Sequence, residues 1–205
     1  MFIVQSVDVK KARLRRHVAE LVAAAPVEQR AVWDRAIQAR LLTDMIYYRS
    51  RVVHCYLALP DEVATERVVR TALSDGKRVV VPVVAAKDRT LVLAEITDYD
   101  GELAAGYRGI LEPRGGEERT VDPSEVDLFI VPGAVFDRRG HRLGRGLGYY
   151  DRCLSRVKGL AVICAVAYEL QVLEEVPADV HDVPVDCIVT ERRVIECRGS
   201  GERAD

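Results

Sequence analysis

The sequence predicts an α/β protein in which helices cover a mostly parallel sheet on both sides. Short apolar runs bounded by Gly, Pro or charged residues recur along the chain, which is typical of buried strands. Residues 51–84 read as strand, helix and strand, and residues 126–168 return to that order around a glycine-rich loop. Because parallel neighbours need a crossover connection, we expect a three-layer domain built on one such sheet.

The first part of the chain is predicted to form two helices, at roughly 8–24 and 28–42, separated by Pro26. Apolar residues recur at helical spacing in both segments, which are marked by Leu14, Val18, Leu21 and Val22 in the first and by Val32, Ile37 and Leu41 in the second. We therefore expect a helical N-terminal part that packs onto the sheet.

The first strand–helix–strand unit begins with the apolar run at 51–59. A helix is predicted over 61–76, where Gly76 marks its end, and a second strand follows at 77–84. The segment from about 87 to 124 is less regular, with a possible strand at 91–96 and Gly- and Pro-rich loop chemistry after it.

The second half of the chain resumes the pattern with a buried strand at 126–133 that ends in Pro-Gly. A helix is expected at about 147–157, a strand at 159–168 and a short hairpin at 185–196. We expect one domain over residues 1–198 and a frayed tail at 199–205.

Composition narrows the class of protein. The 205 residues are 49% hydrophobic and 30% charged, which suits one globular domain with a real core. The net charge of −2 gives no reason to expect a nucleic-acid or membrane partner, and no obligate protein partner is indicated. The short apolar stretch at the start precedes its charges, which is the wrong order for a secretory signal.

The cysteines indicate a reducing compartment, and we expect the protein to be cytoplasmic. Their number is five, which is odd, and no CxxC pair exists, so neither a disulfide framework nor a zinc site is suggested. Cys55, Cys164 and Cys187 lie in apolar, strand-like runs, where small buried thiols are common.

The segment with the clearest chemistry is VPGAVFDRRGHRLGRGLGYYDR, at residues 131–152. Glycines allow close approach of the backbone to an anion, and Arg142 and Arg145 add charged donors, so the loop suits phosphate. It is neither a Walker A motif nor a complete dinucleotide-binding fingerprint. A flexible surface loop with solvated arginines is the alternative interpretation.

Asp151 follows the glycines and Tyr149–Tyr150 directly, and a carboxylate beside a phosphate site can bind Mg²⁺. Asp151 could instead be a helix-start carboxylate, and the two tyrosines could simply be core residues. Near the start of the chain, Lys11 and Arg15 are four residues apart and share one helix face. They could both reach phosphates, or they could form a solvated basic face.

The loop at 140–152 closely resembles the signature of the 5-formyltetrahydrofolate cyclo-ligase family. Further matches occur in the family's order over nearly the whole chain: KKARLR, YLALPDEVATE, GKRVVVP, RGILEP, DLFIVPGAVFD, AYELQVLEEVPADVHDVPVD and the TE at 190–191. The resemblance implies a fold related to the sugar-phosphate isomerase and coenzyme A transferase-like proteins. In such open α/β sheets, the ligand cleft lies at the carboxyl ends of the strands.

The resemblance also implies a reaction. In that family, ATP phosphorylates the formyl oxygen of 5-formyltetrahydrofolate, the neighbouring nitrogen attacks the activated carbon, and phosphate leaves to give 5,10-methenyltetrahydrofolate. Mg²⁺ accompanies ATP, which is a co-substrate. No protein nucleophile is needed, because the protein positions the substrates and stabilises phosphate charge.

The site residues implied by the resemblance fall into four groups. Arg142 and Arg145 are expected to be catalytic, as the main clamp on the transferring phosphate, and Asp151 and Asp182 to be the magnesium ligands. ATP is expected to contact Lys11, Arg15, Arg142, Leu143, Gly144, Arg145, Gly146, Leu147, Gly148, Tyr149 and Tyr150. The folate is expected to contact Leu57, Glu62, Arg145, Gly146, Leu147, Gly148 and Tyr149. From the residues alone, Asp182 reads as a turn residue and Glu62 as a carboxylate that caps a helix start.

Two positions depart from the family pattern. Arg108, preceded by Tyr107, stands where an aromatic residue is common, and Val83 stands where a basic residue often follows proline. Arg108 could stack on a base, or Tyr107 could take the aromatic's place through a shift of register. These departures motivate one alternative, a diverged paralogue that uses ATP on another formylated or heterocyclic compound. A non-catalytic folate- or nucleotide-binding protein is a second alternative, from another class.

Overall fold

The computed structural model describes residues 7–85, 90–106, 111–115, 119–146 and 148–197. Its main element is a seven-stranded sheet in the order β12-β11-β9-β6-β1-β2-β3. The inner strands are parallel, and both edge strands are antiparallel to their neighbours. The strands are β1 (Val52–Cys55), β2 (Arg78–Ala85), β3 (Thr90–Ile96), β6 (Leu128–Val131), β9 (Val162–Val166), β11 (Cys187–Val189) and β12 (Val194–Glu196).

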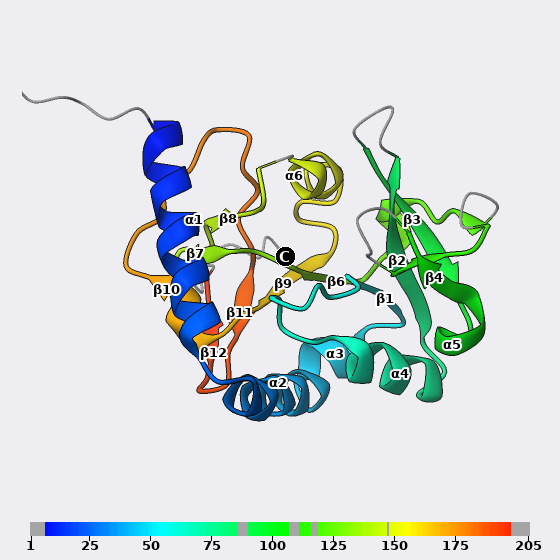
Figure 1. Cartoon of the computed structure of the whole chain (residues 1–205). Helices are drawn as coiled ribbons and strands as arrows, with labels where there is room; N and C mark the ends of the chain where they lie inside the picture. Colours follow the sequence, from blue (N-terminus) through cyan, green and yellow to red (C-terminus); the bar gives the residue numbers. More distant parts are fainter. Residues whose placement is uncertain (1–6, 86–89, 107–110, 116–118, 147, 198–205) are drawn as a thin grey trace, which may run out of the picture.

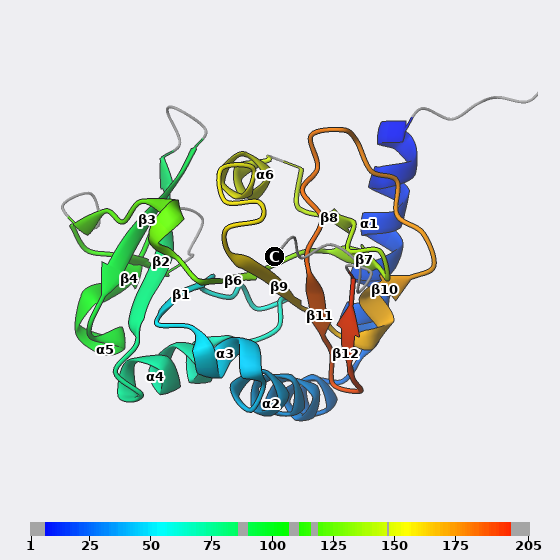
Figure 2. The ribbon, with the colours of Figure 1, turned by 180° about the vertical axis from the view of Figure 1, so that it is seen from behind.

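Helices cover both faces of this sheet, as Figures 1 and 2 show. The elements α2 (Val27–Leu42), α3 (Met45–Arg49) and α4 (Glu66–Ser74) lie on one face, and α6 (Tyr149–Leu154) lies on the other. Alternate strand residues accordingly fall into two buried clusters, one containing Val53 and Ile130 and the other containing Phe129 and Ile163. The predicted three-layer α/β arrangement is therefore present.

Smaller elements surround the main sheet. A three-stranded sheet has the order β10 (Val172–Leu173), β7 (Val135–Asp137) and β8 (Arg142–Leu143), and β4 (Leu103–Ala105) pairs with β5 (Leu111–Pro113). The short helices are α5 (Tyr99–Glu102), η3 (Pro123–Glu125) and η4 (Glu169–Gln171). Beside the outer edge of β3, Thr120 bridges Ala94, and the Val121 N–H donates to Leu93 at 2.8 Å.

The strand order reverses direction between β1 and β6. From β1 the chain crosses through α4 to β2 on one side, whereas β6, β9 and β11 extend the sheet on the other side. The loops that leave β1 and β6 therefore diverge from the carboxyl ends of these strands, which is where open α/β sheets bind ligands. The first loop carries Leu57 and Glu62, and the second leads into the glycine-rich segment.

Several predicted boundaries are wrong, and the contacts explain why. The strand expected over 51–59 ends at Cys55, and the helix expected from 61 begins only at Glu66. The intervening loop is held by side chains: Tyr56 Oη donates to the Val63 carbonyl and Thr65 Oγ1 donates to the Tyr56 carbonyl, each at 2.7 Å. These bonds favour a compact loop over continuation of either element.

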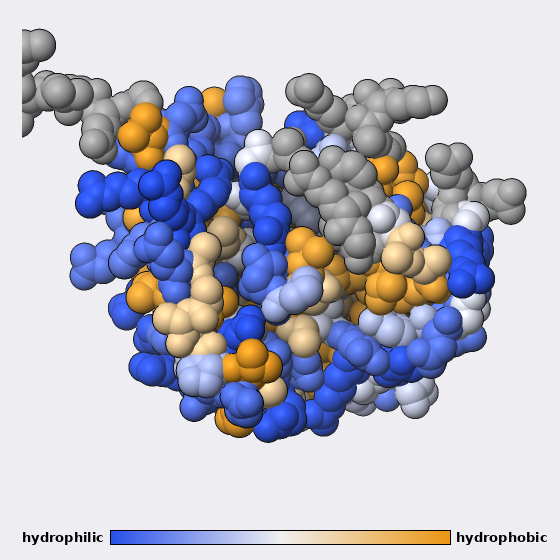
Figure 3. All heavy atoms as spheres, viewed as in Figure 1, coloured by the Kyte–Doolittle hydropathy of each residue, from blue (hydrophilic) through white to orange (hydrophobic). Residues whose placement is uncertain are grey.

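Helix α1 (Val7–Ala24) buries only a narrow stripe formed by Lys11, Val18 and Val22. Leu21 is 41% exposed and Val32 on α2 is 49% exposed, so these two members of the apolar helical patterns do not face the core. Figure 3 shows hydrophilic residues predominating over α1, with hydrophobic ones scattered among them. Within the described residues, no helix combines the length and apolar character needed to cross a bilayer.

The contrast between Ile37 and Val32 on α2 yields a stability prediction. Ile37 is fully buried, so Ile37→Ala should lower the free energy of unfolding by about 2–5 kcal/mol, through lost burial and a residual cavity. Val32→Ala is the matched control on the same helix and should change stability by no more than about 0.5 kcal/mol. Urea denaturation of both variants measures the difference, and equal losses would contradict the burial of Ile37.

Candidate functional site

The glycine-rich segment connects β8 to α6 above the carboxyl end of the sheet (Figure 1). Gly146 and Gly148 have φ angles of +96° and +65°, which side-chain-bearing residues rarely adopt, and Gly148 precedes the first turn of α6. Leu147, which was predicted to contact both substrates, lies outside the described residues. The glycines thus allow the chain to turn sharply before it enters α6.

A buried carboxylate that the sequence reading missed holds the preceding turn. Asp137 at the end of β7 is fully buried and accepts hydrogen bonds from the N–H groups of Arg139, His141 and Val176, at 2.9–3.1 Å. His141 Nδ1 lies 2.9 Å from the same carboxylate. Its signal in the sequence was an aspartate three residues before the glycine of a turn, Gly140, and its role here is to fix the start of the loop.

Arg142 is the buried arginine of the loop, with a side chain only 3% exposed. Its guanidinium donates to the Val183 carbonyl and, through Nη2, to Asp151 Oδ1 at 2.8 Å. The same carboxylate oxygen accepts from the Val183 N–H at 3.2 Å. Arg142 therefore ties β8, α6 and the segment around Val183 together, and the catalytic role expected for it stays a prediction beside this structural one.

Arg145 is the half-exposed arginine of the loop, and it reaches the loop that follows β1. Its Nε donates to Glu62 Oε1 at 3.1 Å and its Nη2 donates to Asp61 Oδ1 at 2.7 Å. Both acidic residues follow β1, so this contact joins the two loops that diverge where the strand order reverses. The structure thereby brings together two predicted site residues that are 83 positions apart in the chain.

Glu62 is mostly buried, with 15% of its side chain exposed. Its Oε2 accepts the Leu59 N–H at 3.0 Å, and its own N–H donates to the Leu59 carbonyl at 3.0 Å. It therefore closes a tight turn, and the alternative that it caps a helix start is wrong because α4 begins at Glu66. Leu57 lies in the same loop and is buried.

The basic pair on α1 also reaches this region. Lys11 Nζ lies 2.5 Å from Asp179 Oδ2 and 3.0 Å from Asp182 Oδ2, with a Lys11 side chain only 9% exposed. Arg15 Nε donates to the Gly144 carbonyl at 2.7 Å. A solvated basic helix face is therefore the wrong interpretation of these two residues, because both have tertiary partners. Asp179 was missed, although it lies only three residues before Asp182.

The ion pairs shift the titration of this cluster. Burial acts to lower the pKa of Lys11, but its two carboxylate partners outweigh burial and raise it above its usual value. Burial acts to raise the pKa of Asp182, but the Asp179 N–H and the Lys11 ammonium outweigh it and leave the pKa below its usual value. Both directions keep the pair charged at neutral pH.

The two predicted magnesium ligands lie close together, because Asp151 on α6 accepts a hydrogen bond from the N–H of Val183, the residue that follows Asp182. The hydrogen bonds of Asp151 use Oδ1 and those of Asp182 use Oδ2, so the other oxygen of each carboxylate has no hydrogen bond to a described residue. This donor set fits Mg²⁺, which takes one or two carboxylates together with phosphate oxygens and water. Among the described residues, no three His, Cys, Asp or Glu side chains come together as a richer metal cluster.

The two tyrosines lie differently. Tyr150 packs its ring edge-on to His54, with centroids 5.7 Å apart, and burial raises the pKa of its hydroxyl well above the usual value. Burial also lowers the pKa of His54 to about 3, so His54 is neutral at physiological pH. Tyr149 lies under the Arg152 guanidinium, 5.5 Å from it. The core interpretation therefore holds for the Tyr150 ring.

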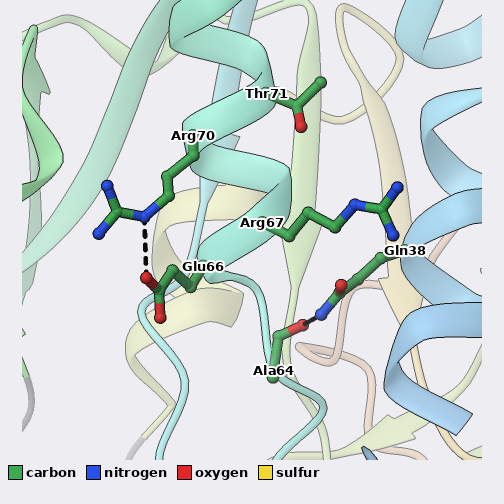
Figure 4. A pocket seen from close by; sticks show the side chains of 6 residues that line it. All are labelled: Gln38, Ala64, Glu66, Arg67, Arg70 and Thr71. Carbon is green, nitrogen blue, oxygen red and sulfur yellow. Dashed lines mark hydrogen bonds and ion pairs between the residues drawn. The ribbon is translucent and has the colours of Figure 1, made fainter. Parts of the chain in front are cut away.

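Three further positions complete the account of the predicted residues. Leu143 is buried in β8, and Val83 lies in β2, paired with Val92 of β3. Arg108 and Tyr107 lie outside the described residues. An open cavity of about 320 Å³ lies between α2 and α4, away from the glycine-rich segment, and Figure 4 shows its lining of Gln38, Ala64, Glu66, Arg67, Arg70 and Thr71.

Comparisons with known proteins agree with this geometry. The model of the 5-formyltetrahydrofolate cyclo-ligase family matches residues 7–191. A 5-formyltetrahydrofolate cyclo-ligase of Mycolicibacterium smegmatis is 34% identical over 147 residues, covering 71% of this chain and 76% of the relative. The mouse 5-formyltetrahydrofolate cyclo-ligase is 27% identical over 195 residues, covering 91% and 96%.

A solved structure gives the same result. The NMR structure of Aquifex aeolicus 5,10-methenyltetrahydrofolate synthetase superposes with a TM-score of 0.82 at 33% identity, covering 95% of this chain and 96% of the other.

Proposed function

This chain belongs to the 5-formyltetrahydrofolate cyclo-ligase family, and we propose that it closes a ring on 5-formyltetrahydrofolate at the expense of ATP. The γ-phosphoryl group passes to the formyl oxygen and ADP leaves. The neighbouring nitrogen of the folate then attacks the activated carbon, and the carbon–oxygen bond to phosphate breaks. The products are 5,10-methenyltetrahydrofolate, ADP and phosphate.

The observation that carries this proposal is the contact between Arg145 and Glu62. It places a cation from the glycine-rich segment within 3.1 Å of a carboxylate from the loop after β1, at the point where the strand order reverses. A cation on one side and a hydrogen-bond acceptor on the other suit a site where a phosphate meets a nitrogen heterocycle.

On the ATP side, we assign the phosphates to the cations and open backbone around the glycine-rich segment. The residues are Lys11, Arg15, Arg142, Leu143, Gly144, Arg145, Gly146, Leu147, Gly148, Tyr149 and Tyr150. The contact from Arg15 to the Gly144 carbonyl supports this group, because it brings α1 to the segment. Lys11 is buried against Asp179 and Asp182, next to the Val183 carbonyl to which Arg142 donates. In this assignment Arg142 and Arg145 stabilise the charge on the transferring phosphoryl group.

On the folate side, we assign the pterin ring to Glu62 and the buried Leu57, with Arg145, Gly146, Leu147, Gly148 and Tyr149 completing the wall. A pterin presents an amino group and a ring N–H side by side, and one carboxylate can accept from both. Glu62 is well suited because its turn with Leu59 already fixes its orientation.

We assign Mg²⁺ to Asp151 and Asp182, each of which has one carboxylate oxygen without a hydrogen bond to a described residue. When bound, the metal neutralises phosphate charge. The protein's own contribution is to hold these carboxylates: Arg142 orients Asp151, and Lys11 orients Asp182. When ATP and the metal bind, these charged side chains exchange one partner for another and do not have to be brought into position.

Two broader assignments are also part of the proposal. We propose that the fold is related to the sugar-phosphate isomerase and coenzyme A transferase-like proteins, which the mostly parallel sheet supports. We propose a cytoplasmic enzyme with small-molecule partners only, which the odd cysteine number and net charge support.

The purified protein, incubated with ATP, Mg²⁺ and 5-formyltetrahydrofolate, should form the methenyl product. The absorbance of that product measures the reaction. Product formation should require both ATP and divalent metal, because the phosphoryl transfer is assigned to this site. ATP turnover that responds to another formylated or heterocyclic compound, with none on 5-formyltetrahydrofolate, would support the diverged paralogue. Folate or nucleotide binding without any turnover would support the non-catalytic alternative.

Glu62→Gln should weaken folate binding by about 10- to 100-fold, since a hydrogen bond to a charged group contributes about 1.5–3 kcal/mol. The affinity for ATP should change little. Asp61→Asn is the matched control, because it also removes an ion pair with Arg145 but leaves the carboxylate of Glu62. Titration calorimetry and thermal melting of both variants separate the outcomes. A loss of stability in Glu62→Gln without a folate-selective defect would contradict the assignment.

Asp151→Asn should raise the Mg²⁺ concentration needed for activity, because it removes one ligand charge while keeping the side chain's shape. Asp100→Asn is the control, because Asp100 is an exposed aspartate that pairs with Arg70 away from the site. Metal titrations of initial rate measure the effect. If Asp151→Asn unfolds the protein or leaves the metal dependence unchanged, Asp151 serves only as the partner of Arg142.

A further inference from the structure

The side of α2 that faces the loop after β1 is polar. Arg30, Asp34 and Gln38 are spaced four residues apart, so they lie on one side of the helix. Gln38 is only 6% exposed, and Asp34 and Arg30 are partly buried. Polar side chains in such positions need partners, because an unpaired buried polar group is costly.

All three side chains bond to the backbone of residues 60–64. Arg30 Nη1 donates to the Pro60 carbonyl at 3.1 Å, and the Ala64 N–H donates to Asp34 Oδ1 at 3.3 Å. Gln38 Nε2 donates to the Ala64 carbonyl at 2.5 Å, as Figure 4 shows. The bonded residues Pro60 and Ala64 flank Asp61 and Glu62 in the chain.

Asp34 also holds a second loop. Its Oδ1 accepts from the Tyr168 hydroxyl at 2.9 Å, and Tyr168 follows β9. The Tyr168 ring packs on Trp33, with centroids 5.4 Å apart. In the sheet, β6 lies between β9 and β1. The Asp34 carboxylate therefore joins the loop after β9 to the loop after β1, which leave the sheet on either side of β6.

The loop that carries Glu62 has little regular structure of its own. Between the end of β1 and the start of α4, its backbone is held by the side chains of Tyr56, Thr65 and Glu62 and by the polar face of α2. A change at Asp34 therefore moves the loop without removing any group that we assign to substrate. This property distinguishes a residue that positions Glu62 from one that contacts the folate.

We propose that Asp34 is a positioning residue that sets the affinity for the folate by fixing the loop of Glu62 against α2 and Tyr168. The proposal rests on the assignment of Glu62 to the folate. Burial acts to raise the pKa of Asp34, and the bonds from Tyr168 and Ala64 oppose this without cancelling it, which agrees with a carboxylate enclosed between two loops.

The kinetic test compares Asp34→Ala, Asp34→Asn and Tyr168→Phe. Asp34→Ala removes the acceptor of both bonds and should raise the KM for 5-formyltetrahydrofolate by roughly tenfold, with the KM for ATP nearly unchanged. Asp34→Asn keeps an oxygen acceptor and should restore most of the loss. Tyr168→Phe removes one of the two bonds and should give a smaller, folate-selective rise.

Tyr47→Phe is the matched control. Tyr47 is a buried tyrosine whose hydroxyl donates to Asp75 at 2.6 Å, near the amino ends of β1 and β2. Its loss should lower the melting temperature about as much as Tyr168→Phe does, with both KM values unchanged. Equal effects of Tyr47→Phe and Tyr168→Phe on the folate KM would overturn the proposal, because they would mark a general response to lost stability.

Hydrogen exchange gives a second measurement that needs no turnover. In Asp34→Ala and Tyr168→Phe, the amides of Leu59, Glu62 and Ala64 should exchange faster, whereas Asp34→Asn and Tyr47→Phe should leave them protected. If the wild-type protein makes no methenyl product, the proposed function fails while this exchange experiment still tests the positioning of the loop. Unchanged exchange in Tyr168→Phe, which keeps the ring packing, would overturn the positioning role even if Asp34→Ala did not fold.

Discussion

The central strands β1 and β6 are four residues each and end while still fully buried. The chain that leaves them must satisfy its backbone N–H and C=O groups without a sheet partner. Side chains therefore do so: Glu62 and Asp34 after β1, and Gln171 after β6, whose amide donates to the Gly133 and Ala134 carbonyls at 3.1 Å. The loops that form the candidate site therefore depend on hydrogen bonds from side chains, in place of the backbone hydrogen bonds that join neighbouring strands.

The same region balances its charges internally. Lys11 faces two aspartates, Arg142 faces Asp151, and Arg145 faces Asp61 and Glu62. Cations held in this way keep their orientation before a ligand arrives, and such preorganisation is what lets charge stabilise a transition state. The cost is that a phosphate or a metal has to replace existing partners. The partly buried pairs of Lys11 and Arg142 will be harder to replace than the more exposed pair of Arg145 and Asp61.

The sequence alone was sufficient to predict the layers of the fold and the protein family. Apolar runs and helical spacing located α1, α2, β2, β3 and the hairpin of β11 and β12 closely, because each of these elements carries its own apolar pattern. It was not sufficient for β7, β8 and β10, whose two or three residues are too short to show any period. The helix expected from residue 61 failed because side-chain bonds from Tyr56 and Thr65 overrode local propensity.

The candidate site shows the same division. Arg145, Asp151 and Lys11 were named from the sequence, and so was one partner of each. The pairings between them were not predicted, since a pairing over such separations leaves no trace in one chain. Asp137, Asp179 and Asp34 were missed for that reason: a lone aspartate beside a turn or on a helix looks ordinary until the fold supplies its donors. Val32 and Leu21 are the opposite case, because both fit the apolar helical pattern and yet are exposed. Helical spacing alone does not reveal how wide the buried stripe of a helix is.

The edge strand β3 has a consequence for how the protein behaves in a crowded solution. A seven-residue strand with one free side is a template on which a strand from another molecule can add. Here the segment at Thr120 and Val121 already bonds to Ala94 and Leu93 on that side, so part of the template is occupied from within the chain. The opposite edge is β12, which is only three residues long. The sheet is thus limited at both ends against growth by strand addition, the first step of many routes to fibrous aggregation.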